Sequence, residues 1–155
     1  MNKRITSVIL LVTIMAFSRF AGAQQHNILL IIGDDIGLDS LHISNTSTNA
    51  SYPPIPNIQT LAERGVLFSN GYAYPTCSPT RASILTGRYG YRTGVVSPDT
   101  AENFSTHEYT LPEVMADQTL GYSLASVGKW HLGGGNDGPN ALGGWPYFAG
   151  SLGGG

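Results

Sequence analysis

The 155-residue sequence has little charge, no basic excess and almost no cysteine. Charged residues make up only 12% of it, whereas chains that stay extensively disordered are rich in charge and poor in apolar side chains. The 8 Lys and Arg do not outnumber the 10 Asp and Glu, so the composition argues against a nucleic-acid partner. The single cysteine, Cys77, excludes an internal disulfide. Its thiol is therefore intermolecular, reactive or chemically processed, unless it is buried and inert.

Long apolar runs are also scarce, and the first of them predicts an export signal. Two basic residues precede an apolar run from Ile5 to Phe17, which is shorter than the roughly 20 residues that span a bilayer. An Ala-x-Ala pattern at residues 21–23 is typical of a cleavage site. Residues 1–23 are therefore predicted to be a secretory signal peptide, with a buried N-terminal helix as the alternative. We expect an exported protein, periplasmic or extracellular, without a stable membrane anchor.

The rest of the sequence predicts strands that alternate with helices. The apolar run over residues 27–32 predicts a strand buried on both faces, and further strands are predicted at 66–68 and 122–127. Short helices are predicted from Asn57 to Gly65, from Ser78 to Gly87 and from Leu111 to Gln118, where capping residues or apolar positions fit. This alternation indicates an α/β fold with a largely parallel sheet.

The last segment differs in composition from the rest. Glycine fills 10 of the 23 positions from 133 to 155, and no helical or strand period is visible there. Compact domains rarely end on a long structureless tail. We therefore expect the chain to stop inside a domain and to be an incomplete gene product.

Two polar clusters lie where a predicted strand ends or a predicted helix begins. Asp34 and Asp35 follow the first strand, at the sheet edge where open α/β folds bind ligands. Paired carboxylates suit Ca²⁺ or Mg²⁺, although a solvated turn is the alternative. Cys77 and Arg81 open the second helix, whose N-terminus favours an anion and a polarised nucleophile. An ordinary capped helix with Arg81 on its surface is the alternative for this cluster.

A third cluster follows the third predicted strand. Lys129 offers a positive point charge, and His131 offers acid–base chemistry near neutral pH. Its alternative is a basic loop beside a packed Trp130. Together the three clusters suit the cleavage of an anionic ester, in which cations hold the anion and a nucleophile attacks it.

Taken in order, these motifs resemble those of the sulfatase family. The segment from Cys77 to Gly87 is similar to the first family signature, C-x-P-S/T-R-x-x-x-L-T-G. Gly121-Tyr122 with the segment 128–133 resembles the second signature, and the segment 27–37 resembles the opening strand and metal pair. The similarity covers roughly residues 26 to 135. Leu124 departs from the usual Thr, a change that we expect to affect packing only.

The resemblance implies the fold and the roles of individual residues. The fold would be alkaline-phosphatase-like, with a largely parallel central sheet flanked by helices, and residues 24–155 would be its N-terminal portion. A formylglycine-generating enzyme would convert Cys77 to formylglycine, whose hydrate is the nucleophile toward a sulfate ester. Arg81, Lys129 and His131 would be the other catalytic residues. Metal ligands would be Asp34, Asp35 and residue 77, holding Ca²⁺ or, alternatively, Mg²⁺.

The resemblance therefore predicts a sulfuric ester hydrolase, active as part of a longer chain. The fragment alone is expected to be inactive, because the family's remaining metal ligands and a further His and Lys lie downstream. A phosphonate or phosphate monoester hydrolase of the same superfamily is the alternative enzyme. A non-catalytic exported fragment is the alternative outside catalysis. The substrate is left open among sulfated glycans, aryl sulfates and choline sulfate.

Overall fold

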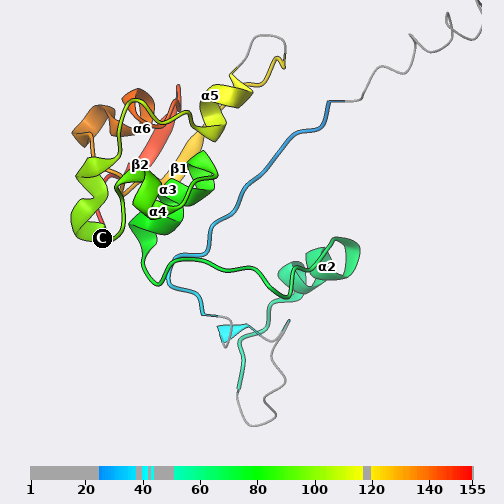
Figure 1. Ribbon diagram of the computed structural model, residues 1–155. Helices are drawn as coiled ribbons and strands as arrows, with labels where there is room; N and C mark the ends of the chain where they lie inside the picture. The colour runs from blue at the N-terminus through cyan, green and yellow to red at the C-terminus, as the bar shows by residue number, and fades with distance from the viewer. Residues whose placement is uncertain (1–24, 38–39, 42, 44–50, 117–119, 155) are drawn as a thin grey trace, which may run out of the picture. The chain divides into compact units, whose positions relative to one another are not determined.

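The computed structural model describes residues 25–37, 40–41, 43, 51–116 and 120–154 (Figure 1). The chain divides into two units, residues 1–33 and residues 34–155. The predicted signal peptide lies outside the described residues, as does the end of the predicted helix beyond residue 116. Among the helices that are described, none is long and apolar enough to cross a membrane.

The second unit holds short helices and a two-stranded parallel sheet. The helices are α2 (Pro56–Arg64), α3 (Cys77–Thr86), α4 (Gly90–Thr93), α5 (Leu111–Met115) and α6 (Gly138–Ala141), with 3₁₀-helices η3 (Pro98–Asn103) and η4 (Gly135–Asp137). The strands are β1 (Ser126–Lys129) and β2 (Phe148–Ser151), paired in parallel. The mixture of helices with a parallel sheet confirms the predicted α/β class.

The three predicted helices are present, with shifted starts. α2 begins at Pro56, because proline suits the first helical position, and Asn57 lies inside the helix rather than capping it. α3 begins at Cys77 with Thr76 in the N-cap position, so Ser78, the predicted N-cap, lies inside the helix. It ends as predicted at Gly87, which adopts a left-handed φ of 65° and donates its N–H to the Ser83 carbonyl.

Two of the three predicted strands are wrong in this structure. Residues 27–32 and 66–68 have no regular secondary structure, and apolar side chains in both segments are exposed, as at Leu29 (83%) and Phe68 (81%). A strand forms only when its backbone pairs with a neighbour, and the one sheet of the described residues pairs β1 with β2 alone. The third predicted strand is present as β1, displaced toward the C-terminus.

The prediction of a structureless glycine-rich tail is also wrong. η4, α6 and β2 all lie in it, because several of its glycines allow close packing. A Cβ on Gly143 would lie 2.5 Å from the Trp130 ring, and a Cβ on Gly150 would lie 1.8 Å from the carbonyl oxygen of Gly128 across the sheet. These glycines let β2 and α6 pack closely against β1 and the indole that follows it.

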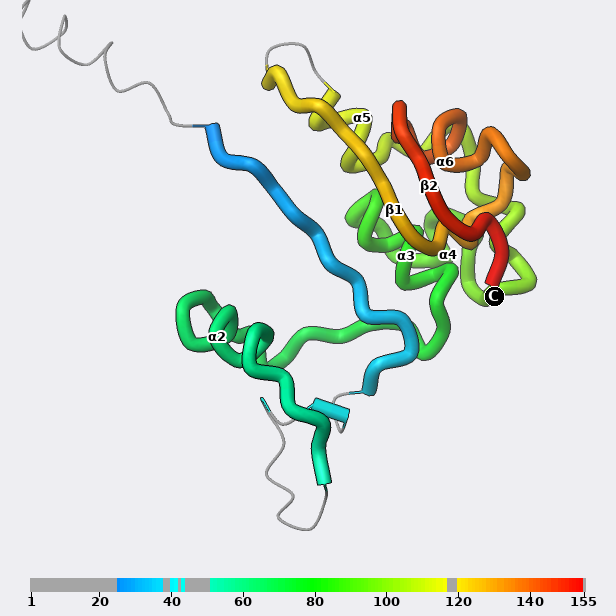
Figure 2. The backbone as a smooth tube through the Cα atoms, turned by 180° about the vertical axis from the view of Figure 1, so that it is seen from behind, coloured from blue at the N-terminus to red at the C-terminus, as the bar shows by residue number. Residues whose placement is uncertain are grey.

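A small apolar core ties α3 to the segment that follows β1. Its buried residues are Ala82, Leu85, Val95, Phe104, Trp130 and Leu132. Helices α3 and α4 lie over one face of the β1–β2 sheet (Figure 1), and Figure 2 shows the same strands from the opposite face. The core therefore fixes the start of α3 beside the end of β1, which positions the site described next.

Candidate active site

A network of three charged side chains joins the predicted metal and anion clusters. The Asp34 carboxylate accepts hydrogen bonds from two cations: Arg81 Nη2 at 3.0 Å and Lys129 Nζ at 2.8 Å. Arg81 also donates through Nη1 to the main-chain oxygen of Lys129 at 2.5 Å. The guanidinium therefore ties α3 to the end of β1 and to Asp34 at once. Its side chain is only 10% exposed, whereas that of Asp34 is 38% exposed, so the bond between them is partly open to water.

The Asp34 carboxylate and the cations that bind it favour the ionised forms of Asp34 and Lys129. The hydrogen bond from Lys129, followed by that from Arg81, lowers the pKa of the Asp34 carboxyl. The hydrogen bond to Asp34 raises the pKa of the Lys129 ammonium. Near neutral pH the network therefore consists of two cations around one carboxylate, and its net positive charge faces the start of α3.

The nucleophile candidate lies beside the candidate acid–base group. Cys77 Sγ is 3.1 Å from His131 Nδ1, although 54 positions separate the two residues in the chain. Burial, followed by the nearby positive charge of Lys129, lowers the pKa of His131 and so favours the neutral imidazole. A neutral ring can accept or donate a proton at Nδ1, depending on its tautomer. The pair can therefore exchange a proton between residue 77 and the imidazole.

A buried hydroxyl holds His131 in an unusual backbone conformation. His131 has a φ of 57°, in the left-handed region that non-glycine residues rarely adopt. Ser78 Oγ, with Ser78 fully buried, donates to the His131 carbonyl at 2.9 Å. Cys77 and Ser78, adjacent in α3, thus hold the imidazole and the carbonyl of the same residue. Nothing in the spacing of the sequence could have indicated this role of Ser78.

We expect Ser78→Ala to lower the free energy of unfolding by about 1–2 kcal/mol, because it removes the hydroxyl partner of the His131 carbonyl. Urea unfolding measures the change. Ser83→Ala is the matched control, since it lies in the same helix and its hydroxyl is buried without a hydrogen-bond partner in the described structure. That control is expected to be neutral, and equal effects of both substitutions would contradict the assigned role of Ser78.

The described residues fit only part of a calcium site. No cluster of three His, Cys, Asp or Glu side chains that could hold a metal occurs within the described ranges. Asp34 already binds Arg81 and Lys129, yet each carboxylate oxygen has two lone pairs and can accept a second partner. Asp35 is exposed, and its φ of 55° turns the chain directly after Asp34. Two carboxylates provide fewer than the 6–8 oxygen atoms that Ca²⁺ takes.

The structure brings most of the predicted site residues together. Asp34, Arg81 and Lys129 form the charged network, and Cys77 and His131 form the adjacent pair. The two groups share α3 and the segment 129–131, so they belong to one site. Sequence reasoning missed the bond from Arg81 to the main chain of Lys129, because no side-chain pattern reports a backbone acceptor.

Comparison with known proteins gives consistent matches to one family. Residues 26–154 match the family model described as Sulfatase. Over 135 residues the chain is 38% identical to arylsulfatase A of Bos taurus, covering 81% of this chain. It is 36% identical to the steryl-sulfatase of Homo sapiens over 72% of this chain. It is 39% identical to the N-acetylgalactosamine-6-sulfatase of Canis lupus familiaris over 73% of this chain.

The matched region is a minor part of each relative. The chain spans 25% of the bovine protein, 20% of the human protein and 23% of the canine protein. No solved structure matches the chain.

Proposed function

The chain belongs to the sulfatase family, and on that premise we propose that it is part of a longer enzyme that hydrolyses sulfate esters through residue 77. The observation that carries the proposal is the contact of 3.1 Å between Cys77 and His131, beside a network of Arg81 and Lys129. A nucleophile, an acid–base group and two cations are the parts that cleavage of an anionic ester needs.

Each residue has a proposed role that follows from its contacts. His131 exchanges a proton with the side chain at position 77 through Nδ1. Lys129 presents its ammonium to the sulfate oxygens while Asp34 keeps that ammonium protonated. Arg81 is a positioning residue, because its guanidinium is bonded to Asp34 and to the Lys129 main chain.

Maturation of Cys77 to formylglycine is part of the proposal. As the hydrate, this group supplies two hydroxyls, one to attack sulfur and one to release sulfate afterwards. A thiol lacks the second hydroxyl and cannot complete that cycle. Cys77 lies at the first residue of α3 and is partly exposed, with Pro79 and Arg81 buried behind it. A formylglycine-generating enzyme is therefore a proposed partner.

A bound Ca²⁺ would be held in part by Asp34 and Asp35, with residue 77 as a further ligand. Its charge would stabilise the negative charge of the sulfate group and of the nucleophile. Mg²⁺ is the alternative cation, since it takes the same oxygen ligands. Export directed by the N-terminal 23 residues completes the proposal.

The alternative enzyme is a phosphate or phosphonate monoester hydrolase with the same nucleophile. The sulfatase names of the relatives favour the sulfate ester. Turnover of nitrophenyl sulfate and of nitrophenyl phosphate by a longer protein that contains this chain separates the two. Sulfate turnover that exceeds phosphate turnover is expected, and the reverse order would overturn the assignment.

A mass measurement tests maturation directly. The chain is co-expressed with a formylglycine-generating enzyme, and the peptide that contains Cys77 is analysed. We expect one sulfur and two hydrogens to be replaced by one oxygen, with a hydrated form alongside. An unmodified thiol, next to a control sulfatase that is converted, would contradict the proposal.

A further inference from the structure

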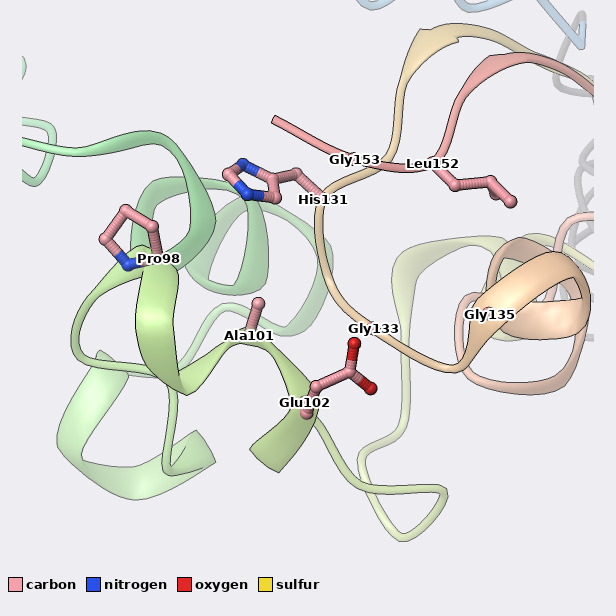
Figure 3. Close-up of a pocket in the computed structure, with 8 residues that line it drawn as sticks. All are labelled: Pro98, Ala101, Glu102, His131, Gly133, Gly135, Leu152 and Gly153. Carbon is pink, nitrogen blue, oxygen red and sulfur yellow. The ribbon is translucent and has the colours of Figure 1, made fainter. Parts of the chain in front are cut away.

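The backbone that follows β2 passes beside the His131 imidazole. The His131 N–H donates to the Leu152 carbonyl at 3.1 Å, so the contact between the two strands continues past their ends. Figure 3 shows Leu152, Gly153 and His131 around one pocket, with the backbone running on past the imidazole ring after Gly153. The next residue, Gly154, is half-buried. It lies against the ring of the proposed acid–base group.

Gly154 has no room for a side chain, because the imidazole occupies the space that a Cβ would take. A Cβ on Gly154 would lie 2.8 Å from Cε1 and 2.9 Å from Nε2 of His131, well inside the usual contact distance between heavy atoms. The same Cβ would lie 3.5 Å from Nδ1, the ring atom that contacts Cys77. The φ of Gly154 is not in the left-handed region, so space rather than backbone conformation requires glycine here.

A larger residue at position 154 would displace the ring and not the backbone of His131. That backbone is held at both ends, since its N–H is bonded to the Leu152 carbonyl and its carbonyl accepts the Ser78 hydroxyl at 2.9 Å. The imidazole, in contrast, is the free end of a side chain that turns about two torsions. Because the ring is rigid, a shift that clears Cε1 also moves Nδ1 relative to Cys77 Sγ, which lies 3.1 Å away.

We infer that Gly154 is a positioning residue for the proposed reaction: its missing side chain leaves the space in which the His131 ring reaches residue 77. The inference rests on the proposed function, in which His131 exchanges a proton with the nucleophile. A misplacement of a reacting group by about 1 Å can lower a rate by about a hundredfold. Turning a side-chain ring disturbs the rest of the fold little. Gly154 therefore affects the rate of the reaction much more than the stability of the protein.

Steady-state turnover of nitrophenyl sulfate by a longer protein that contains this chain tests the inference. We expect Gly154→Ala to lower kcat by at least about tenfold, to leave KM within about twofold, and to keep the thermal midpoint of unfolding. Gly153→Ala is the matched control, because it adds the same methyl group at the adjacent residue, where no atom lies within 4 Å of the added Cβ. Neither glycine has a left-handed φ, so alanine strains neither backbone position. The control is expected to match the parent protein in kcat, KM and thermal midpoint.

Crystal structures of the two variants show directly which part of the molecule yields. In Gly154→Ala we expect the His131 ring to be turned or shifted, with Nδ1 beyond hydrogen-bond distance of residue 77. In Gly153→Ala the ring is expected to stay in place. A ring that has not moved in Gly154→Ala, beside a displaced backbone after Gly153, would overturn the inference. A Gly154→Ala protein that fails to fold would overturn it too, because the ring would then not be the part that yields.

The outcomes also distinguish this inference from the proposed function. Turnover of nitrophenyl sulfate by the parent protein tests the proposed function alone. If the parent protein is active, a Gly154→Ala variant with the parental kcat, or equal losses in both glycine variants, rejects the role of Gly154 and keeps the sulfatase. If the parent protein is inactive, the proposed function fails. The crystal structures then still decide whether Gly154 holds the His131 ring beside residue 77.

Discussion

Replacing Cys77 with alanine is expected to abolish sulfate ester hydrolysis by a longer protein that contains this chain, lowering kcat by at least about a thousandfold. Alanine carries no atom that can attack sulfur, and it removes the partner of His131 Nδ1. The fold is expected to persist, because residue 77 is the partly exposed first residue of α3 and alanine is a good helix former. The loss of activity would therefore reflect chemistry and not unfolding.

Turnover of nitrophenyl sulfate, measured together with the thermal midpoint of unfolding, checks this expectation. Ser83→Ala serves as the control in the same helix, with unchanged turnover expected. A Cys77→Ala protein that keeps most of its rate and its thermal midpoint would show that residue 77 is not the nucleophile. That result would leave the Cys77–His131 contact as packing only.

Part of the candidate site could be predicted because four of its residues lie at the ends of regular elements, whereas residues 27–32 before Asp34 form no strand. Cys77 and Arg81 are one helical turn apart, so the start of α3 places both at the same end of the helix. Lys129 ends β1 and His131 comes two residues later, which brings them to the same region of the unit. The ends of helices and strands are marked by local features, which indicated the places of α3 and β1 but not their exact bounds.

The contacts that hold the site together could not be predicted in the same way. The bond from Arg81 to the Lys129 carbonyl and the bond from Ser78 to the His131 carbonyl both end on the main chain. Every residue has a carbonyl, so no residue type marks the acceptor. The left-handed φ of His131 likewise could not be predicted, since histidine adopts this region more often than most non-glycine residues but still uncommonly.

The predictions of strands at 27–32 and 66–68 were wrong for a different physical reason. Both segments are apolar, as strands often are. A strand also needs a neighbouring strand to accept and donate its hydrogen bonds, and composition alone does not identify that neighbour. In the tail, Gly150 faces Gly128 in the β1–β2 register because any Cβ there would overlap the opposite carbonyl. Within one segment, glycine is taken as a residue that interrupts a strand. The close approach of these two strands nevertheless requires glycine.

Arg81→Lys is expected to lower kcat/KM by about a hundredfold and the free energy of unfolding by about 1–2 kcal/mol. The guanidinium bonds two acceptors at once, Asp34 Oδ1 at 3.0 Å and the Lys129 carbonyl at 2.5 Å. The lysine ammonium is a compact charge on a shorter side chain than that of arginine. It can therefore stay beside Asp34, but it cannot bond both acceptors at once. The main chain of Lys129 would then lose its anchor to α3.

Arg81→Met is expected to destabilise the protein more than Arg81→Lys, with a loss of about 3 kcal/mol in the free energy of unfolding. Methionine keeps much of the apolar stem but removes the charge, which leaves Asp34 with Lys129 as its remaining cation. The value is at the low end for breaking a buried ion pair, because the Asp34 side chain is 38% exposed and keeps part of its hydration.

Urea unfolding and steady-state turnover are measured for the parent protein, Arg81→Lys and Arg81→Met. Together they separate the effect on stability from the effect on kcat/KM. Arg64→Lys is the matched control, since Arg64 is exposed at the end of α2 and the charge is conserved. If Arg81→Lys matches the parent protein in both measurements, charge alone suffices and the two-acceptor bond is not required. If it loses stability but keeps kcat/KM, Arg81 holds the fold and does not position the reacting groups. Loss of both, with Arg64→Lys unchanged, is the outcome that the geometry around Asp34 and Lys129 predicts.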